Sequence, residues 1–327
     1  MIELIIGRAG VGKTFECLRR AKEILEREPL KTEIIFLLPA YQTYRAELEL
    51  AAMTGGAFNT RMNSFNRFAR QLLDEIGGGL TPRISEIGRR LLLRKILLRR
   101  DKAGDLKYFV RAAKQHGFAE ILSEELKELR TYSIDAEKLS EAADKVDNDE
   151  LKDKLRDLKL LAEDFKAALS DKLTDDENLL ERATEFLEQS PTIASAEIFI
   201  DGFIFFDPQQ REFIKKLLTC AKNIHITLPM DTDLNNRENV LEVGIFNRAF
   251  ETFKTLRGFA EKLGVEFRIT RLDNPRRFKA EPLKILEQRL FEYKPKSFER
   301  SEGLKIVEAV NRRAEVEAVA REILLMV

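Results

Sequence analysis

An octapeptide near the amino terminus combines residue types that suit phosphate binding. Gly7 to Thr14 matches the pattern G-x-x-x-x-G-K-[ST] at every fixed position. An apolar run precedes it and an amphipathic helical pattern follows it, which is the context that a phosphate-binding loop requires. Such a loop surrounds phosphates with backbone N–H groups at a helix amino terminus. The alternative interpretation is a chance glycine-rich turn in front of a helix.

The residue types of this loop predict binding of ATP together with Mg²⁺. Lysine reaches the β- and γ-phosphates as a compact positive charge, and the hydroxyl of the last residue binds Mg²⁺. We expect Thr14 to be this magnesium ligand. The predicted nucleotide-binding residues are Gly7, Arg8, Ala9, Gly10, Val11, Gly12, Lys13 and Thr14.

Asp201 is the candidate for a second group in the magnesium shell. It closes the apolar run Ile198–Ile200, and nucleotide-hydrolysing enzymes with this loop place a carboxylate at the end of a neighbouring strand. The alternative is an aspartate that caps a turn with Gly202. A glutamate that would orient the attacking water is missing at that next position. We therefore expect nucleotide binding with weak hydrolysis, and the catalytic residues stay unknown.

The composition restricts the other kinds of site. The cysteines are Cys17 and Cys220 and the histidines are His116 and His225, too few for a disulfide framework, a zinc site or an iron–sulfur cluster. We expect Cys17 to be buried on the first helix. The net charge is zero, so the totals do not indicate a general electrostatic attraction to nucleic acid. The sequence shows neither a membrane span nor a secretory signal, and we expect a cytoplasmic protein without a membrane partner.

Strand and helix patterns alternate over the first 80 residues. Apolar runs at residues 3–6, 33–38 and 57–62 predict strands. Residues 13–26 and 42–53 predict helices, with Pro29 ending the first, and Ser64 predicts the cap of a helix that runs to Ile76. This alternation favours a parallel sheet covered by helices on both faces.

The middle of the chain has a different pattern. Gly77, Gly78, Gly79 and Pro82 interrupt the alternation, and residues 84–189 show helical spacing with almost no strand signal. Strand patterns return at residues 197–204, 224–228 and 265–269, with helices predicted at 208–221 and 246–263. A linker rich in Pro, Lys and Arg follows. One strand at 304–307 and one helix at 313–325 are expected to begin a further domain that is left incomplete.

The fold class expected from these patterns is α/β, with a parallel sheet interrupted by a large all-helical insertion. We predict a nucleotide-binding domain from residues 1–80 and 191–272, a helical insertion at 81–190, a linker at 273–303 and the start of a truncated second domain at 304–327.

Several short segments, in order along essentially the whole chain, resemble the N-terminal part of the AddB family, the B subunits of the bacterial ATP-dependent helicase/deoxyribonuclease. The phosphate loop alone is a generic motif, whereas the ordered set is much more specific. These segments are residues 7–14, 36–43 (FLLPAYQT), 64–69 (SFNRFA), 117–120 (GFAE), 200–203 (IDGF) and 311–317 (NRRAEVE).

This resemblance implies a superfamily 1 helicase-like arrangement, in which a RecA-like domain is interrupted by a helical insert and a second RecA-like domain begins near Leu304. It also implies an AddA-like partner subunit, with which the family processes double-strand DNA ends for recombinational repair and recognises the Chi sequence. The family keeps the phosphate loop while lacking most other helicase motifs, which agrees with Gly202. The family's nuclease carboxylates and iron–sulfur cysteines have no matching positions here, so we expect neither nuclease activity nor a cluster.

Two further groups of residues could contact DNA. Ser64 to Phe68 follows the third predicted strand, where related helicases bind single-stranded DNA, although Phe65 and Phe68 also suit a core. A run of basic residues could bind DNA phosphates or a partner subunit, or could form the solvated side of a helix. This run comprises Arg89, Arg90, Arg94, Lys95, Arg99 and Arg100.

Three functions are therefore compatible with the sequence. The first is a helicase-like, ATP-binding subunit of a DNA-end-processing complex, whose nucleotide site regulates more than it drives. The second is a stand-alone P-loop ATPase or nucleotide kinase. The third is an architectural DNA-binding or docking module with a vestigial loop. Robust ATP turnover by the isolated chain would favour the second, and the absence of any thermal stabilisation by ATP would favour the third.

Overall fold

The structure is a computed structural model that describes residues 1–28, 31–56, 58–77, 82, 84–169, 179–291 and 304–326. The chain divides into two compact units. One consists of Met1–Gly7 and Lys13–Leu272, and the other of Arg8–Gly12 and Asp273–Val327.

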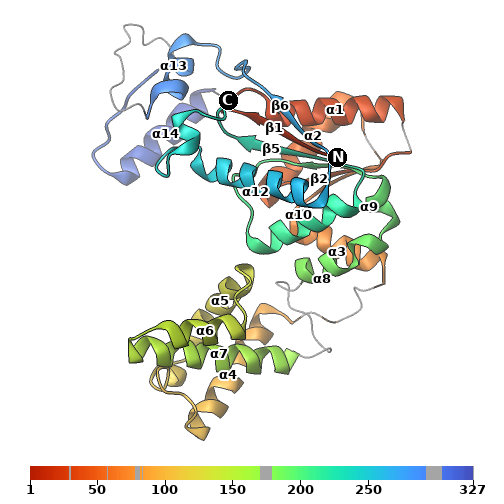
Figure 1. Ribbon diagram of the computed structural model, residues 1–327. Coiled ribbons are helices and arrows are strands. Elements are labelled where there is room, and N and C mark those ends of the chain that lie inside the picture. The colour runs from red at the N-terminus through yellow and green to blue at the C-terminus, as the bar shows by residue number, and fades with distance from the viewer. Residues whose placement is uncertain are drawn as a thin grey trace. The chain divides into compact units, whose positions relative to one another are not determined.

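The first unit contains a six-stranded sheet in which all neighbouring strands are parallel (Figure 1). The strand order is β3-β2-β4-β5-β1-β6. Parallel neighbours need long crossover connections, and here helices provide them. The strands are β1 (Ile2–Gly7), β2 (Ile34–Leu37), β3 (Thr60–Asn63), β4 (Glu197–Ile200), β5 (Asn223–Pro229) and β6 (Phe267–Arg271).

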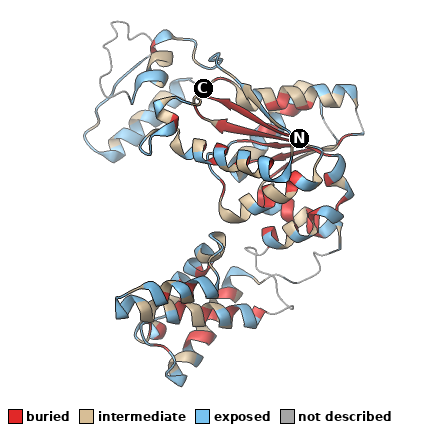
Figure 2. Ribbon diagram, in the orientation of Figure 1, coloured by how far each residue is buried: buried red, intermediate tan, exposed pale blue. Residues whose placement is uncertain are grey.

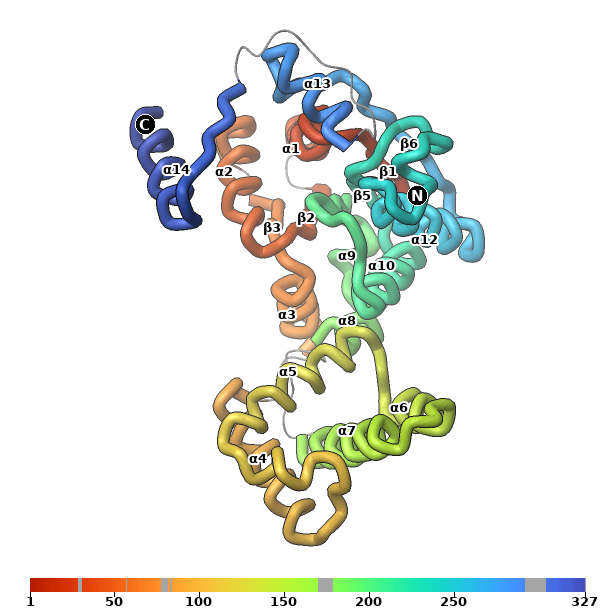
Figure 3. Tube along the Cα trace, turned by 90° about the vertical axis from the view of Figure 1, so that its left-hand side faces the viewer, coloured from red at the N-terminus to blue at the C-terminus, as the bar shows by residue number. Residues whose placement is uncertain are grey.

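Both faces of the sheet are covered by helices, as expected from the nearly continuous apolar strands. Ile34 and Phe36 of β2 pack with α1 and α2, whereas Ile35 and Leu37 pack with α3, α8, α10 and α12. Figure 3 shows α2 and α10 on opposite sides of β2, and in Figure 2 the strands are the most continuously buried part of the chain. These helices are α1 (Lys13–Arg27), α2 (Thr43–Thr54), α3 (Phe65–Glu75), α8 (Leu179–Phe186), α9 (Pro191–Ser195), α10 (Pro208–Cys220), α11 (Arg237–Val240) and α12 (Asn247–Leu263).

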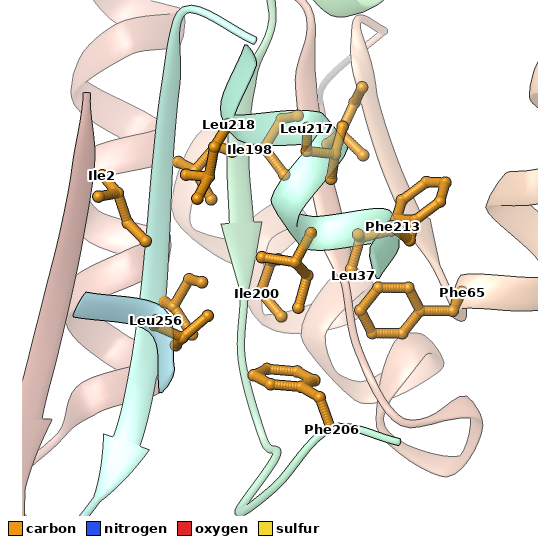
Figure 4. Close-up of a cluster of buried hydrophobic side chains, with 14 of the residues drawn as sticks. Ile2, Leu37, Phe65, Ile198, Ile200, Phe206, Phe213, Leu217, Leu218 and Leu256 are labelled. Atoms are coloured by element: carbon orange, nitrogen blue, oxygen red, sulfur yellow. The ribbon is translucent and has the colours of Figure 1, made fainter. Parts of the chain in front are cut away.

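The larger of the two hydrophobic clusters that flank the sheet is mostly aliphatic and contains several aromatic rings that pack on one another (Figure 4). The ring of Phe213 on α10 meets the ring of Phe65 edge to face, with the centroids 5.9 Å apart. Phe206, which follows β4, also packs on Phe65, at 6.2 Å. The Ser64 hydroxyl caps α3 by accepting a hydrogen bond from the Arg67 N–H, which places Phe65 at the first helical position. The predicted cap at Ser64 and the core role of Phe65 and Phe68 are confirmed.

The described residues between 84 and 189 form helices and no strand, as predicted. Four of these helices share a separate cluster of leucine, isoleucine and phenylalanine side chains. Asp157, which is buried, organises this cluster by accepting backbone hydrogen bonds from Lys107, Tyr108 and Phe109. By contrast, α8 packs with the sheet. The four helices are α4 (Glu86–Ala103), α5 (Phe118–Thr131), α6 (Ala136–Lys145) and α7 (Asp149–Leu169).

The second unit differs from the sequence predictions in two places. Helix α13 (Glu281–Arg289) forms inside the segment predicted to be a linker, of which residues 292–303 lie outside the described part. The predicted strand at residues 304–307 is wrong, because these residues form no strand and pair with none of the strands that the structure describes. A β-strand needs a hydrogen-bonding neighbour, which the apolar pattern alone does not supply. The predicted final helix is confirmed as α14 (Arg312–Met326).

Smaller shifts occur at the strand ends. The predicted third strand begins at Thr60, later than expected, and Ala57 lies outside the described residues together with Pro29, Gly78 and Gly79. The apolar run at 197–204 is a strand only as far as Ile200. Across the described part of the chain, none of the helices combines the length and the apolar character that a bilayer span needs.

Candidate nucleotide-binding site

The predicted phosphate loop connects β1 to α1. Gly10 and Gly12 have φ angles of +75° and +92°, a region that glycine adopts without strain and that other residues avoid. Gly12 stands at a fixed position of the motif and Gly10 at a variable one, and the backbone shape favours glycine at both. Of the other loop residues, Val11 is buried, Ala9 is exposed, and the Arg8 side chain is paired with Glu287.

The two polar residues of the motif lie in the first turn of α1. The Lys13 Nζ donates a hydrogen bond to the Gly7 carbonyl oxygen at 2.8 Å, so the ammonium group is folded back onto the last residue of β1. The helix begins at Lys13, and its amino-terminal N–H groups carry partial positive charge. The ammonium group and these N–H groups both supply positive charge at the start of α1, which would attract an anionic ligand.

Asp201 lies beside Thr14, although 187 residues separate them in the sequence. The Thr14 Oγ1 donates to one carboxylate oxygen of Asp201 at 2.6 Å, and the Thr227 Oγ1 donates to the other. Only 2% of Asp201 is exposed, and its N–H donates to the Leu37 carbonyl oxygen at 3.1 Å. Asp201 is therefore held from β2 on one side and from β5 on the other.

The sequence analysis did not predict Thr227 as a residue of this site. It lies on β5, the strand between β4 and β1 in the sheet order, so its hydroxyl can reach a carboxylate at the end of β4. The available signal was a threonine within the apolar run of residues 224–228. That signal is weak because threonine is common in strands.

Gly202 shows why a glutamate is disfavoured directly after Asp201 in this fold. Its φ is +85°, and a Cβ atom added there would lie 2.5 Å from the Gln42 Oε1 and 3.0 Å from the Pro39 Cδ. A larger residue would need both a strained backbone and a displaced Gln42 side chain.

The residues present fit a nucleoside triphosphate with Mg²⁺ in their chemistry. Glycines of positive φ let a backbone curl around phosphates, and Lys13 adds a cation close to it. The Thr14 hydroxyl and the Asp201 carboxylate are oxygen ligands of the kind that Mg²⁺ prefers, and they already lie in contact. Burial and the nearby Asp201 carboxylate raise the pKa of the Cys17 thiol on α1 well above the ordinary value.

A second buried polar group lies in the sheet and combines residues of three strands that no sequence motif connects. His225 on β5 bridges two carboxylates, with its Nδ1 2.8 Å from the Glu3 Oε2 and its Nε2 3.2 Å from the Glu197 Oε2. Burial lowers the pKa of His225, but the bonds to Glu197 and Glu3 outweigh it and raise the pKa overall. Burial likewise opposes ionisation of Glu3, whose pKa is nevertheless lowered by His225 and by Arg20.

The basic run on α4 is mostly engaged within the helical cluster. Arg89 is buried against the ring of Phe165, which contradicts its interpretation as part of a solvated helix side. Arg94 donates to the Ala113 carbonyl oxygen at 2.7 Å, and Arg100 pairs with Asp164 at 2.6 Å. A contact of this run with DNA or a partner protein stays a prediction.

Comparison with known proteins places the chain in a family. The family described as "ADDB, N-terminal" matches residues 4–287. The B subunit of the ATP-dependent helicase/deoxyribonuclease of Desulforudis audaxviator is 36% identical over 99% of this chain, and that of Desulforamulus reducens is 35% identical over 99%. The protein of the same name from Bacillus cereus is 35% identical over 98%. The chain spans 28% of the length of each of these relatives. The chain therefore belongs to the AddB family, to whose N-terminal region it corresponds.

Proposed function

We propose that this chain is the nucleotide-binding part of an AddB-type subunit, and that it binds ATP with Mg²⁺ at the loop Gly7–Thr14. The observation that carries the proposal is the contact of Thr14 with Asp201 at 2.6 Å. Two residues proposed for the magnesium shell from separate sequence signals are adjacent in the fold. A chance glycine-rich turn would not require a buried carboxylate at that position.

The roles of the chain's own residues follow from their chemistry. The loop N–H groups and Lys13 would bind the phosphates, and Mg²⁺, when bound, would neutralise phosphate charge. Thr14 and Asp201 would hold the ion, while Thr227 would keep the carboxylate oriented through its hydrogen bond. The parallel sheet, with β5 between the loop strand and the Asp201 strand, supports a RecA-like interpretation of the domain.

We infer that this site regulates or stabilises the protein more than it hydrolyses ATP. Hydrolysis needs a base that orients the attacking water, and the position after Asp201 is closed to a side chain by its φ of +85° and by Gln42. Bound nucleotide would then act by stabilising one state of the protein, with an energy set by its affinity and concentration.

The wider role is proposed from the relatives. Their names identify them as one subunit of an ATP-dependent helicase/deoxyribonuclease. By analogy, we propose that this chain acts with an AddA-like partner subunit on DNA double-strand ends in recombinational repair. Its nucleotide site would contribute to that complex.

Equilibrium binding of ATP and of a nonhydrolysable analogue, with and without Mg²⁺, tests the nucleotide proposal. Lys13→Ala should weaken binding about 10- to 100-fold, since hydrogen bonds to charged groups contribute about 1.5–3 kcal/mol. Asp201→Asn should weaken binding in Mg²⁺ and spare metal-free binding. Lys22→Ala is the matched control, because Lys22 lies on the same helix and pairs at the surface with Glu26.

Three outcomes would reject parts of the proposal. Equal affinity of the wild type and Lys13→Ala would rule out phosphate binding by this loop. Robust turnover by the isolated chain would favour a stand-alone ATPase or kinase. A melting temperature that saturating ATP leaves unchanged would favour a docking module with a vestigial loop, because ligand at 100 times its Kd stabilises by about 2.7 kcal/mol.

A further inference from the structure

The loop residues 8–12 pack against a later part of the chain, and all of these contacts lie within the second unit. The backbone N–H groups of Arg276 and Arg277 donate to the Gly10 carbonyl oxygen at 2.8 and 3.0 Å. The Phe278 ring lies where a Cβ of Gly10 would point, and the Arg276 side chain lies where a Cβ of Gly12 would point. Residues 276–278 therefore pack against the loop's two glycines of positive φ.

A second contact joins the loop to the carboxyl end of α13. The Arg8 Nε lies 3.1 Å from each carboxylate oxygen of Glu287, and the Nη2 donates to the Glu287 carbonyl oxygen at 2.9 Å. The Nη2 also reaches the Gln288 carbonyl oxygen at 3.4 Å. The two side chains are only 19% and 16% exposed. A guanidinium at the carboxyl end of a helix satisfies carbonyl groups that lack helical partners and meets their partial negative charge.

These contacts distinguish two roles for Arg8. A direct phosphate ligand would point its charged group at the nucleotide, and a nearby carboxylate would weaken it. Here the guanidinium is instead bonded to the Glu287 carboxylate and to main-chain carbonyl groups of α13. A charge-assisted contact of this kind orients the residue that carries it.

We propose that Arg8 is a positioning residue that fixes the phosphate loop to α13, so that nucleotide binding at the loop and the order of α13 are coupled. This inference rests on the proposed nucleotide function of the loop. A loop already held in its binding shape loses less conformational freedom when phosphates bind, and its affinity is higher for that reason. Coupling between two sites is reciprocal, so bound nucleotide must stabilise the contact with α13 by the same factor.

The Glu287→Gln substitution separates the two roles because they predict opposite changes in ATP affinity. If Arg8 positions the loop, loss of the carboxylate should weaken ATP binding about 5- to 10-fold, within the usual range of such couplings. If Arg8 binds phosphate directly, removal of a competing negative charge should strengthen ATP binding. Glu281→Gln is the matched control, because Glu281 lies on the same helix and pairs with Lys284 at the surface.

Hydrogen exchange of residues 281–289 gives a readout besides affinity. In the wild type, ATP should slow exchange across α13, and this protection should be lost in Arg8→Ala and in Glu287→Gln but kept in Glu281→Gln. The double variant Arg8→Ala/Glu287→Gln should bind ATP no more weakly than Arg8→Ala, because both changes break one contact. Thermal unfolding of each variant shows that the chain remains folded.

The outcomes separate this inference from the proposed function. Failure of the wild type to bind ATP, or no effect of Lys13→Ala, would reject the nucleotide site itself. If the wild type binds ATP normally, three results would leave that site intact and overturn the positioning role of Arg8. These are a higher ATP affinity in Glu287→Gln, additive effects of the Arg8→Ala and Glu287→Gln substitutions, and no ATP-dependent protection of α13.

Discussion

Substitution of Gly10 by alanine should detach residues 276–278 from the loop. The φ of +75° costs an L-residue about 1–2 kcal/mol. The new Cβ would lie 2.7 Å from the Phe278 Cε2 and 3.2 Å from the Arg277 Cβ, and overpacking of this kind costs about 1–3 kcal/mol. The combined strain is therefore about 2–5 kcal/mol.

Two hydrogen bonds hold the segment to the loop. The two hydrogen bonds from the Arg276 and Arg277 N–H groups to the Gly10 carbonyl oxygen contribute about 0.5–1.5 kcal/mol each. Release of the segment relieves only the steric part of the strain, about 1–3 kcal/mol, which matches the combined contribution of the two hydrogen bonds. Hydrogen exchange at these two amides should therefore accelerate about tenfold or more.

Two variants control this prediction. Gly55 also has a φ of +75°, but apart from its neighbours in the chain no atom of the described residues lies within 4 Å of its Cβ position, so Gly55→Ala should show the backbone cost alone in urea unfolding. Phe278→Ala should remove most of the steric part, so that adding Gly10→Ala to it costs about as much as Gly55→Ala. Unchanged protection of Arg276 and Arg277 in Gly10→Ala would refute the reasoning.

Three other predictions concern the stability of the fold, measured by urea unfolding. Phe213→Ala should cost about 3–5 kcal/mol, because Phe213 is fully buried between the sheet and α3, and a smaller loss would show that the cluster collapses around the cavity. Asp157→Ala should cost about 3 kcal/mol or more by leaving three backbone N–H groups without their acceptor, whereas an effect below about 1 kcal/mol would show that water replaces it. The raised pKa of His225 gives stabilisation that is fully present below its unfolded pKa of about 6.5 and is lost as the pH rises through the folded value. His225→Gln should remove this loss of unfolding free energy at higher pH. Glu3 has a lowered pKa, so its contribution to the unfolding free energy should still be lost as the pH falls below about 4.5. An unchanged loss of stability at higher pH in His225→Gln would contradict this assignment.

Much of the sheet could be predicted from local patterns. Strands buried on both faces are continuous apolar runs, and β1 and β2 were predicted within one residue or two because the apolar runs are nearly unbroken. The cap at Ser64 was predictable because its hydroxyl serves the next turn of the same helix. The curled backbone of the loop was predictable because glycine adopts positive φ angles without strain and needs no distant partner to do so.

Features that depend on distant partners were missed. Thr227 acquires its role from the strand order, which no local pattern specifies. His225 is bound by two carboxylates from other strands, and Arg8 pairs with a residue 279 positions later. The predicted strand at 304–307 failed for the same reason, since its apolar pattern is local and its pairing is not.

The position of β1 in the sheet also bears on how the protein emerges from the ribosome. Its hydrogen-bonding neighbours are β5 and β6, which end at Pro229 and Arg271. The earliest of the six strands to be synthesised therefore cannot gain both partners until more than 260 further residues have been added. At about 5–20 residues per second this delay is roughly 10–50 s, during which an apolar segment is exposed. Chaperone binding to the nascent chain should therefore be strongest around β1 and end once β6 is complete.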